Sequence, residues 1–248
     1  MKFIKNILEI LFTIYAWLFV ILAFLIHFIF ASIIILFFKH KAEIHQKISA
    51  PIIKLGFLIC GIRVHVQGLE NLTTKKNILI LSNHQSLLDI LVYSMIIPRY
   101  FSFIAKKELA KVPIIGWDLK VQKHILIDRK NPRKALAALN EVKNLLTQGR
   151  SFLMFPEGTR SADSAIGNFK SGAFKLALES GVTIVPCYIN GTNQIIRKKS
   201  LWIWPGKVIV KIGKPLKIDK IDHPQKTKIL ELNEQVKNLI IAEKERKI

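Results

Sequence analysis

The sequence predicts an α/β fold in which a mixed, mostly parallel sheet is flanked by helices and preceded by an N-terminal hydrophobic membrane helix. Two patterns lead to this prediction. Residues 10–38 contain no Asp, Glu, Lys or Arg, which is typical of a segment that enters a bilayer. Beyond residue 61, short apolar runs alternate with stretches of helical periodicity, which is the pattern of a sheet covered by helices.

The N-terminal apolar run is long enough to form one continuous helix. As a helix it would extend about 44 Å, which exceeds a bilayer core of about 30 Å. The first proline is Pro51 and the first glycine is Gly56, so nothing inside the run indicates a hairpin turn. We therefore expect residues 1–40 to form a membrane-anchoring helix, tilted or with one end in the interface. The alternative is a hydrophobic helix that docks on the domain or on a second chain.

The segment after this helix, residues 41–61, is too interrupted to span a membrane. Its basic side chains suit an interfacial helix, and an ordinary connecting helix is the equal alternative. Basic residues are more frequent after the first helix than before it, which places the C-terminal part in the cytoplasm. They are Lys2 and Lys5 before the helix, and Lys39, Lys41, Lys47 and Lys54 after it.

The remaining residues, 62–248, are expected to form one α/β domain. Apolar runs predict seven strands, and two stripes of apolar residues at helical spacing predict core-facing helices. The strands are expected at residues 62–68, 77–82, 100–105, 124–128, 151–156, 183–189 and 207–213, and the helices around residues 135–146 and 229–240.

The composition points to an anionic partner and gives no sign of disulfide bonds. Lys and Arg number 38 against 17 acidic residues, a formal net charge of +21. Such a balance favours lipid headgroups, nucleic acid or phosphorylated metabolites, and charge alone does not choose among them. Cys60 and Cys187 form no C-x-x-C motif, so we expect two small core residues in a reducing compartment.

A histidine and an acid follow the second predicted strand, in NHQSLLD (83–89). The imidazole of His84 can act as a general base near neutral pH, and the carboxylate of Asp89 can fix its tautomer and stabilise the imidazolium. The alternative is that Asp89 and Ser86 form a helix capping box, with an incidental histidine in the turn.

Two further polar motifs follow predicted strands, IDR (127–129) and FPEGTRS (155–161). Gly158 allows the backbone to approach a ligand, and the guanidinium of Arg160 matches phosphate oxygens. Glu157 can hold Arg160 or another cation in place, and Arg129 beside Asp128 repeats the pattern. The alternative for each is a surface ion pair, which contributes little, or a plain turn.

Several enzyme classes lose support because their motifs are missing. The chain contains no G-x-S-x-G, no G-x-x-x-x-G-K-[ST] and no H-E-x-x-H. A serine hydrolase, a P-loop nucleotide enzyme and a common zinc protease are therefore disfavoured.

The three motifs together resemble the glycerolipid acyltransferase family, and most closely its 1-acyl-sn-glycerol-3-phosphate acyltransferases. The resemblance rests on NHQSLLD, IDR and FPEGTRS in that order, followed by FKSGA (169–173) and VPC (185–187). It covers residues 62–215. The family's first motif is N-H-x-x-x-x-D, and the joint order and spacing make the match specific.

The resemblance implies a role for each matching residue. His84 would remove a proton from the acceptor hydroxyl, with Asp89 as its orienting partner, and Val185 and Pro186 would shape the acyl-chain side. A second set would bind the acceptor: Lys106, Arg129, Glu157, Gly158, Thr159 and Arg160. The sequence departs from the family pattern at Lys123, where the family has a glycine, which puts the local geometry of the second motif in question.

The function expected from this resemblance is acyl transfer to the sn-2 hydroxyl of 1-acyl-sn-glycerol-3-phosphate, giving phosphatidic acid. The donor would be acyl-CoA or acyl carrier protein, with no metal or other cofactor. We expect a lipid substrate, an anionic bilayer surface, no nucleic-acid partner, and a bacterial inner-membrane location facing the cytoplasm. The alternatives are another lysolipid or an amino-acid lipid as acceptor, or a membrane-tethered basic binding protein in which the motifs are accidental.

Overall fold

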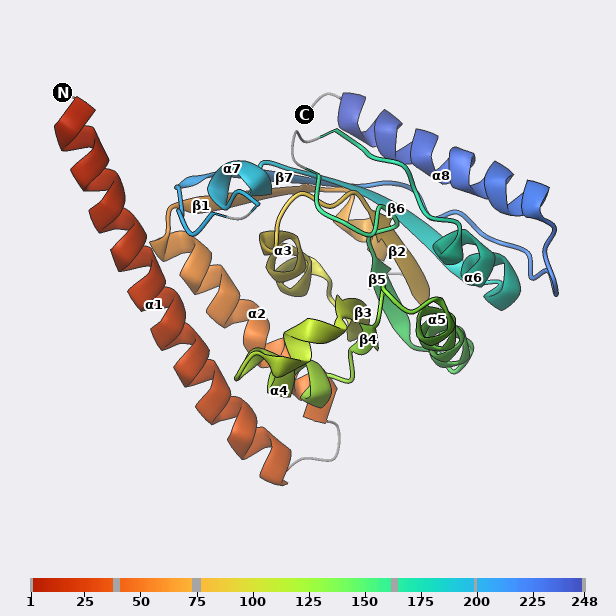
Figure 1. The fold of residues 1–248 in the computed structure, drawn as a ribbon, viewed down its shortest axis with the longest axis horizontal. Coiled ribbons are helices and arrows are strands. Elements are labelled where there is room, and N and C mark those ends of the chain that lie inside the picture. Colours follow the sequence, from red (N-terminus) through yellow and green to blue (C-terminus); the bar gives the residue numbers. More distant parts are fainter. Residues whose placement is uncertain (1, 38–40, 73–76, 162–164, 199, 247–248) are drawn as a thin grey trace.

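A seven-stranded sheet forms the centre of the protein (Figure 1). The computed structural model describes residues 2–37, 41–72, 77–161, 165–198 and 200–246. The strands lie in the order β1-β7-β6-β2-β5-β3-β4. Their bounds are β1 (Ile62–Gln67), β2 (Ile78–Ser82), β3 (Phe101–Lys106), β4 (Ile125–Ile127), β5 (Ser151–Met154), β6 (Thr183–Asn190) and β7 (Gly206–Ile212).

All neighbouring strands are parallel except β6 and β7, which are antiparallel. The prediction of a mixed, mostly parallel sheet is therefore confirmed, and each predicted strand is present within two residues of its expected bounds. The central strand β2 is buried along its whole length, as its unbroken apolar run requires in a sheet covered on both faces.

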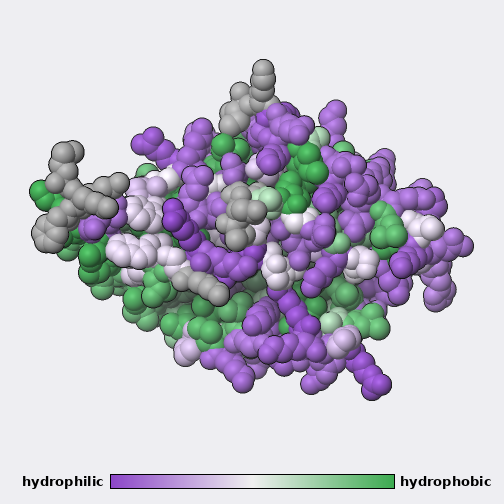
Figure 2. Space-filling view, turned by 45° about the horizontal axis from the view of Figure 1, so that its top comes forward, coloured by the Kyte–Doolittle hydropathy of each residue, from purple (hydrophilic) through white to green (hydrophobic). Residues whose placement is uncertain are grey.

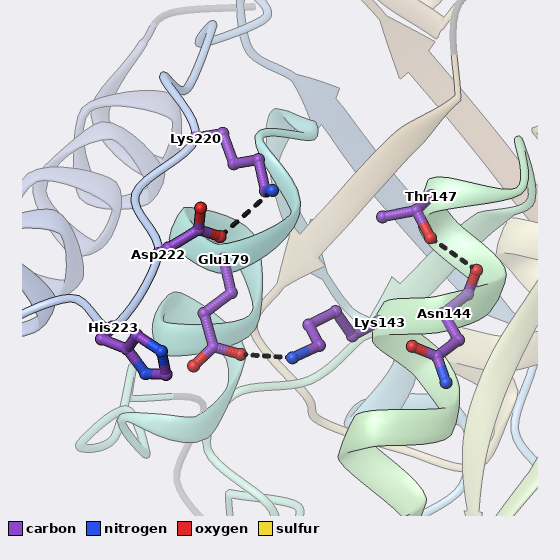
Figure 3. Close-up of a pocket in the computed structure, with 7 residues that line it drawn as sticks. All are labelled: Lys143, Asn144, Thr147, Glu179, Lys220, Asp222 and His223. Atoms are coloured by element: carbon purple, nitrogen blue, oxygen red, sulfur yellow. Dashed lines mark hydrogen bonds and ion pairs between the residues drawn. The ribbon is translucent and has the colours of Figure 1, made fainter.

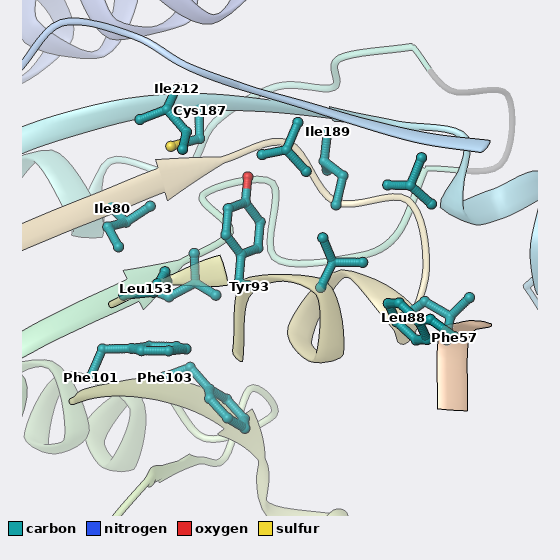
Figure 4. Close-up of a cluster of buried hydrophobic side chains, with 14 of the residues drawn as sticks. Phe57, Ile80, Leu88, Tyr93, Phe101, Phe103, Leu153, Cys187, Ile189 and Ile212 are labelled. Carbon is teal, nitrogen blue, oxygen red and sulfur yellow. The ribbon is translucent and has the colours of Figure 1, made fainter. Parts of the chain in front are cut away.

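Helices cover both faces of the sheet (Figure 1). One face is covered by α5 (Pro132–Thr147), α6 (Gly172–Ser180) and α8 (Lys226–Glu245). The other carries α2 (Lys41–Ile59), α3 (Leu88–Ile96), α4 (Ile115–Val121) and α7 (Thr192–Ile195). Figure 4 shows the core on this second face, where Tyr93 of α3 points toward Cys187 of β6 and Phe57 of α2 lies beside Leu88 of α3. Cys60 and Cys187 are both buried and free of disulfides, as expected.

The N-terminal helix α1 (Lys2–Phe37) is continuous, as predicted. One stripe of it docks on the rest of the protein: Ala16 is fully buried, and Trp17 Nε1 donates a hydrogen bond to the Leu201 carbonyl at 2.6 Å. Most of its apolar side chains are nevertheless exposed, and they form the hydrophobic flank visible in Figure 2. By length and composition, residues Asn6–Phe30 could cross a membrane. Lys39, used in the orientation prediction, lies outside the described residues.

Helix α2 is anchored to the domain along one face. His45, Gln46 and Ser49 are buried there. The Gln46 side chain accepts a hydrogen bond from the Phe101 backbone N–H at 3.1 Å and donates one to the Arg99 carbonyl at 3.2 Å. Residues 41–59 thus form a helix fixed to the beginning of β3, and an interfacial position for its outer face stays a prediction.

Candidate active site

The predicted site residues gather at one edge of the sheet because the strands that precede them are parallel. Strands β2, β5, β3 and β4 are consecutive neighbours with the same direction. Their carboxyl ends lead to His84, to the loop of residues 155–161, to Lys106 and to Arg129, respectively. The carboxyl edge of a parallel sheet is where α/β proteins build their sites.

His84 and Asp89 form a hydrogen-bonded pair. Nδ1 of His84 lies 2.8 Å from Oδ2 of Asp89. The same carboxylate oxygen accepts hydrogen bonds from the backbone N–H groups of Gln85 at 2.7 Å and Ser86 at 3.0 Å. The other carboxylate oxygen accepts one from the Thr192 hydroxyl. Asp89 is fully buried, and these four donors hold it in one orientation. Asp89 therefore both fixes the turn before α3 and orients the imidazole of His84.

The imidazole of His84 lies flat against Phe155. The two ring centroids are 4.1 Å apart with an interplanar angle of 14°, and the His84 side chain keeps 13% of its surface exposed. Since Nδ1 faces Asp89, Nε2 is the nitrogen left to accept a proton. No hydrogen bond to Nε2 is made by any residue that the structure describes. The ring is thus fixed by stacking while its reactive nitrogen remains available.

The turn that carries His84 is tied to the end of β6. The Asn83 side chain accepts a hydrogen bond from the Ile189 N–H at 2.8 Å and donates one to the Ile189 carbonyl at 2.9 Å. Gln85 Oε1 accepts a hydrogen bond from the Gly191 N–H at 3.1 Å. These contacts, on both sides of His84, leave its backbone little freedom.

The third motif contacts the backbone of His84 at two points. Glu157 Oε1 accepts a hydrogen bond from the His84 N–H at 2.9 Å, and the His84 carbonyl accepts one from the Ser161 N–H at 2.9 Å. Glu157 is buried, and its other oxygen accepts from the Gly167 N–H at 3.3 Å. Burial raises the pKa of this carboxyl, and the hydrogen bonds from His84 and Gly167 oppose that shift.

The expectation that Glu157 holds Arg160 or another cation is therefore wrong for the described residues. Its carboxylate supports the turn of His84 because backbone N–H groups, rather than a guanidinium, surround it. The guanidinium of Arg160 makes no hydrogen bond or ion pair with any described residue. It is available to a ligand, on a loop whose next residue, Ser161, is bonded to His84.

Basic side chains converge on the loop of the third motif. Arg129 donates a hydrogen bond to the Gly158 carbonyl, which brings the second and third motifs together as predicted. Lys198 Nζ donates to the Arg160 carbonyl at 2.9 Å. Gly158 has φ of +71°, and a Cβ there would meet Lys170 Cε at 2.9 Å and Nζ at 3.0 Å. The positive φ favours glycine at this position, and a side chain there would also displace the flexible end of Lys170.

Two predicted residues lie at the periphery of this group. Lys106 forms an exposed ion pair with Glu108 at 3.5 Å, and Thr159 is exposed. Asp128 pairs with Lys107 at 2.6 Å, so its partner is Lys107 rather than the adjacent Arg129.

Lys123 preserves the local geometry that a glycine would give. It follows the end of α4 with φ of 54°, in the left-handed region that glycine adopts most easily. The His124 N–H then returns to the Leu119 carbonyl at 2.9 Å, a pattern that commonly ends helices. The lysine at this position therefore does not alter the backbone between α4 and β4, which leads to the second motif.

Sequence reasoning missed several residues of the site. Thr192 bonds Asp89 from 103 positions away, and no sequence pattern links the two. Lys198 lies in a basic loop without a motif. Phe155 is the first residue of FPEGTRS and was quoted only as part of it. Its position directly after the strand beside β2 was the one signal that could have placed its ring against His84.

A separate surface hollow of about 310 Å³ lies away from these residues (Figure 3). It is lined by the end of α5, by α6 and by the loop of residues 220–223, at the opposite edge of the sheet from His84. The ion pair Lys143–Glu179 at 3.0 Å joins α5 to α6, and Lys220 pairs with Asp222 within the loop at 3.1 Å. Its charges are paired with one another, and it holds none of the motif residues.

Comparison with known proteins agrees with this geometry. The model of the Acyltransferase family matches residues 63–190. The chain belongs to this family. The alternative of a basic binding protein with accidental motifs is inconsistent with that membership, because the matched region contains all three motifs.

Curated relatives carry the same kind of name. The chain is 38% identical over 161 residues to a 1-acyl-sn-glycerol-3-phosphate acyltransferase of Chlamydomonas reinhardtii, covering 64% of this chain and 48% of the relative. It is 39% identical over 163 residues to a chloroplastic enzyme of that name from Arabidopsis thaliana, covering 64% and 45%. The Saccharomyces cerevisiae protein of that name is 36% identical over 187 residues, covering 74% and 60%. The chain spans about half the length of the first two.

A solved structure matches almost the whole chain. The crystal structure of the 1-acyl-sn-glycerophosphate (LPA) acyltransferase PlsC from Thermotoga maritima superposes with a TM-score of 0.82 at 28% identity. The match covers 98% of this chain and 99% of that one, so it includes the N-terminal helix.

Proposed function

We propose that the protein transfers an acyl group from an acyl thioester to the free sn-2 hydroxyl of 1-acyl-sn-glycerol-3-phosphate, giving phosphatidic acid. The observation that carries the proposal is the His84–Asp89 pair. Its Nδ1 is held by the buried acid at 2.8 Å, and Nε2 faces no described hydrogen-bond partner. The names of the relatives and of the solved structure support the same acceptor.

The reaction proceeds by direct transfer. Nε2 of His84 accepts the proton of the sn-2 hydroxyl as the hydroxyl oxygen attacks the thioester carbonyl carbon. The carboxylate of Asp89 stabilises the imidazolium that forms. The tetrahedral intermediate then collapses, the C–S bond breaks, and the departing thiolate takes the proton from Nε2. The histidine returns to its initial state, and no cofactor beyond the thioester is required.

The acceptor phosphate is bound by basic side chains around the third motif. Arg160 supplies a guanidinium that pairs with none of the residues that the structure describes, and Arg129 and Lys170 lie against Gly158. A guanidinium offers forked donors that match phosphate oxygens. Glu157 acts indirectly, through the backbone of His84. Val185 and Pro186 are buried in β6 beside β2, so they support the site from within the sheet and do not border the acyl chain directly.

Lipid substrates also account for the N-terminal helix. The exposed apolar side chains of α1 contact the bilayer, and the net charge of +21 attracts anionic headgroups. We place the protein at a bacterial inner membrane with its catalytic residues on the cytoplasmic side, where acyl-CoA or acyl carrier protein delivers the acyl group. Recovery of the full chain in the soluble fraction without detergent would contradict this location.

The test is acyl transfer by the purified full-length chain in detergent. Labelled acyl-CoA and labelled acyl carrier protein are supplied separately, each with lysophosphatidic acid, with a lysolipid that lacks a terminal phosphate, or with an amino-acid lysolipid. We expect labelled phosphatidic acid with at least one donor and a higher kcat/KM for lysophosphatidic acid than for the other acceptors. A higher kcat/KM for another acceptor would mean that the enzyme acylates another lysolipid or an amino-acid lipid. No transfer to any of the acceptors would refute acyl transfer itself.

A further inference from the structure

Three potential metal ligands meet where α1, α2 and α4 pack together, away from the carboxyl edge of the sheet. His27 comes from α1, His45 from α2 and Asp118 from α4. Oδ1 of Asp118 lies 3.4 Å from Nε2 of His27 and 3.2 Å from Nε2 of His45. One ligand atom from each residue lies within 4.8 Å of the others. Segments distant in the sequence thus bring two imidazoles and a carboxylate to one point.

His45 is a buried polar side chain that has no hydrogen-bond partner among the residues that the structure describes. It is 0% exposed, and neither ring nitrogen has a partner among the described residues. The 3.2 Å contact with Asp118 lacks hydrogen-bond geometry. Buried polar groups are nearly always hydrogen-bonded, so an exception requires an explanation.

His27 is a second histidine in an environment that requires an explanation, because it lies in the apolar helix α1. It is the one imidazole in the apolar run of residues 10–38. An ionisable residue in such a segment is costly unless it faces a partner or a functional site. Its side chain faces Asp118 and His45, and the two imidazole centroids are 4.4 Å apart. The helix therefore places its single imidazole toward the other two ligands.

The spacing fits a tetrahedral transition-metal ion. Ligand bonds of about 2.0–2.1 Å place neighbouring ligand atoms about 3.3 Å apart, close to the two separations from Asp118 to the histidines. The third separation, between the ligand nitrogens of the two imidazoles, is no more than 4.8 Å. Gln122 Nε2 donates to Oδ2 of Asp118 at 2.9 Å. This bond orients the carboxylate so that Oδ1 faces the site, as second-shell partners of metal ligands do.

We propose that His27, His45 and Asp118 bind a divalent transition-metal ion, which fastens α1 to α2 and α4. Two imidazoles and one carboxylate favour Zn²⁺ over the oxygen-ligated Mg²⁺ or Ca²⁺. The role is structural, because none of the three residues belongs to the motifs around His84. The proposal is independent of the acceptor and donor of the acyl transfer.

The test uses the full-length protein in detergent, stripped with a chelator and titrated with Zn²⁺ alone. We expect one bound Zn²⁺ per chain, a rise in Tm of several degrees on adding zinc, and the visible absorption of tetrahedral Co²⁺ when cobalt replaces zinc. His27→Gln should weaken zinc affinity at least about 100-fold, since loss of even a second-shell partner costs roughly 10- to 100-fold. His65→Gln is the matched control because His65 is exposed on β1, and it should bind zinc as the unmodified protein does.

His27→Gln is preferred over a change at His45 because His27 is only partly buried, and Asp118→Asn provides a second variant. Equal zinc affinity in His27→Gln, Asp118→Asn and His65→Gln would mean that zinc binds elsewhere on the surface. Absence of stoichiometric zinc from the unmodified protein would mean that the three residues form a histidine–aspartate contact only. Either result overturns the proposal.

Discussion

Replacing Asp89 with asparagine would separate the charge of the buried acid from its hydrogen bonds. One carboxylate oxygen accepts from His84 and from the backbone of Gln85 and Ser86, so the amide oxygen is expected to take that position. The amide N–H₂ would then face Thr192, whose hydroxyl can turn to accept. The fold and the histidine tautomer are therefore retained, and only the negative charge beside the imidazole is lost.

The size of the effect follows from the geometry of the pair. A hydrogen bond of 2.8 Å places the two charge centres about 4 Å apart, which at an effective dielectric constant of about 20 corresponds to about 4 kcal/mol. The imidazolium exists only once the proton has moved, so this energy is lost from the transition state. We expect kcat to fall about 10³-fold, at about 1.4 kcal/mol per tenfold, with the acceptor KM little changed.

The assay is the initial rate of labelled acyl transfer to lysophosphatidic acid at saturating donor. Circular dichroism and thermal melting of Asp89→Asn confirm that the variant is folded. A folded variant that keeps its rate within tenfold of the unmodified protein would refute the role assigned to Asp89.

Three further changes test other parts of the site. Thr192→Val removes one hydrogen bond to the Asp89 carboxylate without altering charge. We expect kcat to fall about tenfold, because a hydrogen bond to a charged group contributes about 1.5 kcal/mol. An unchanged kcat would show that the Thr192 hydroxyl does not position Asp89. Arg160→Ala should raise the acceptor KM about 10- to 100-fold, since hydrogen bonds to charged groups contribute about 1.5–3 kcal/mol; a loss confined to kcat would contradict phosphate binding. Lys123→Gly should raise the free energy of unfolding by about 0.5–1 kcal/mol, because glycine adopts the left-handed conformation of this position without strain. A denaturant titration in which the variant is less stable would contradict the strain assigned to Lys123.

Local sequence patterns were sufficient to predict most of the fold. Strand β2 was visible because an unbroken apolar run suits a strand buried on both faces, and α1 because its apolar run is unbroken by glycine or proline. The pair of His84 and Asp89 could also be predicted, since a separation of five residues at a strand-to-helix turn lets the two side chains meet.

Contacts between distant segments could not be predicted in the same way. The partners of Glu157 are backbone N–H groups, which every residue carries, so no side-chain pattern identifies them. Thr192 reaches Asp89 only because β6 lies beside β2 in the sheet. His27, His45 and Asp118 come from three helices whose packing is set by tertiary contacts.

The most direct test of the chemistry is single-turnover acyl transfer to lysophosphatidic acid by the purified protein and by His84→Ala. Measuring bound substrate separately keeps binding apart from the chemical step. We predict that His84→Ala binds the acceptor but transfers the acyl group at least about 10² to 10⁴ times more slowly, as the loss of a general base commonly costs. Transfer at an undiminished rate by the folded variant would mean that another group removes the proton.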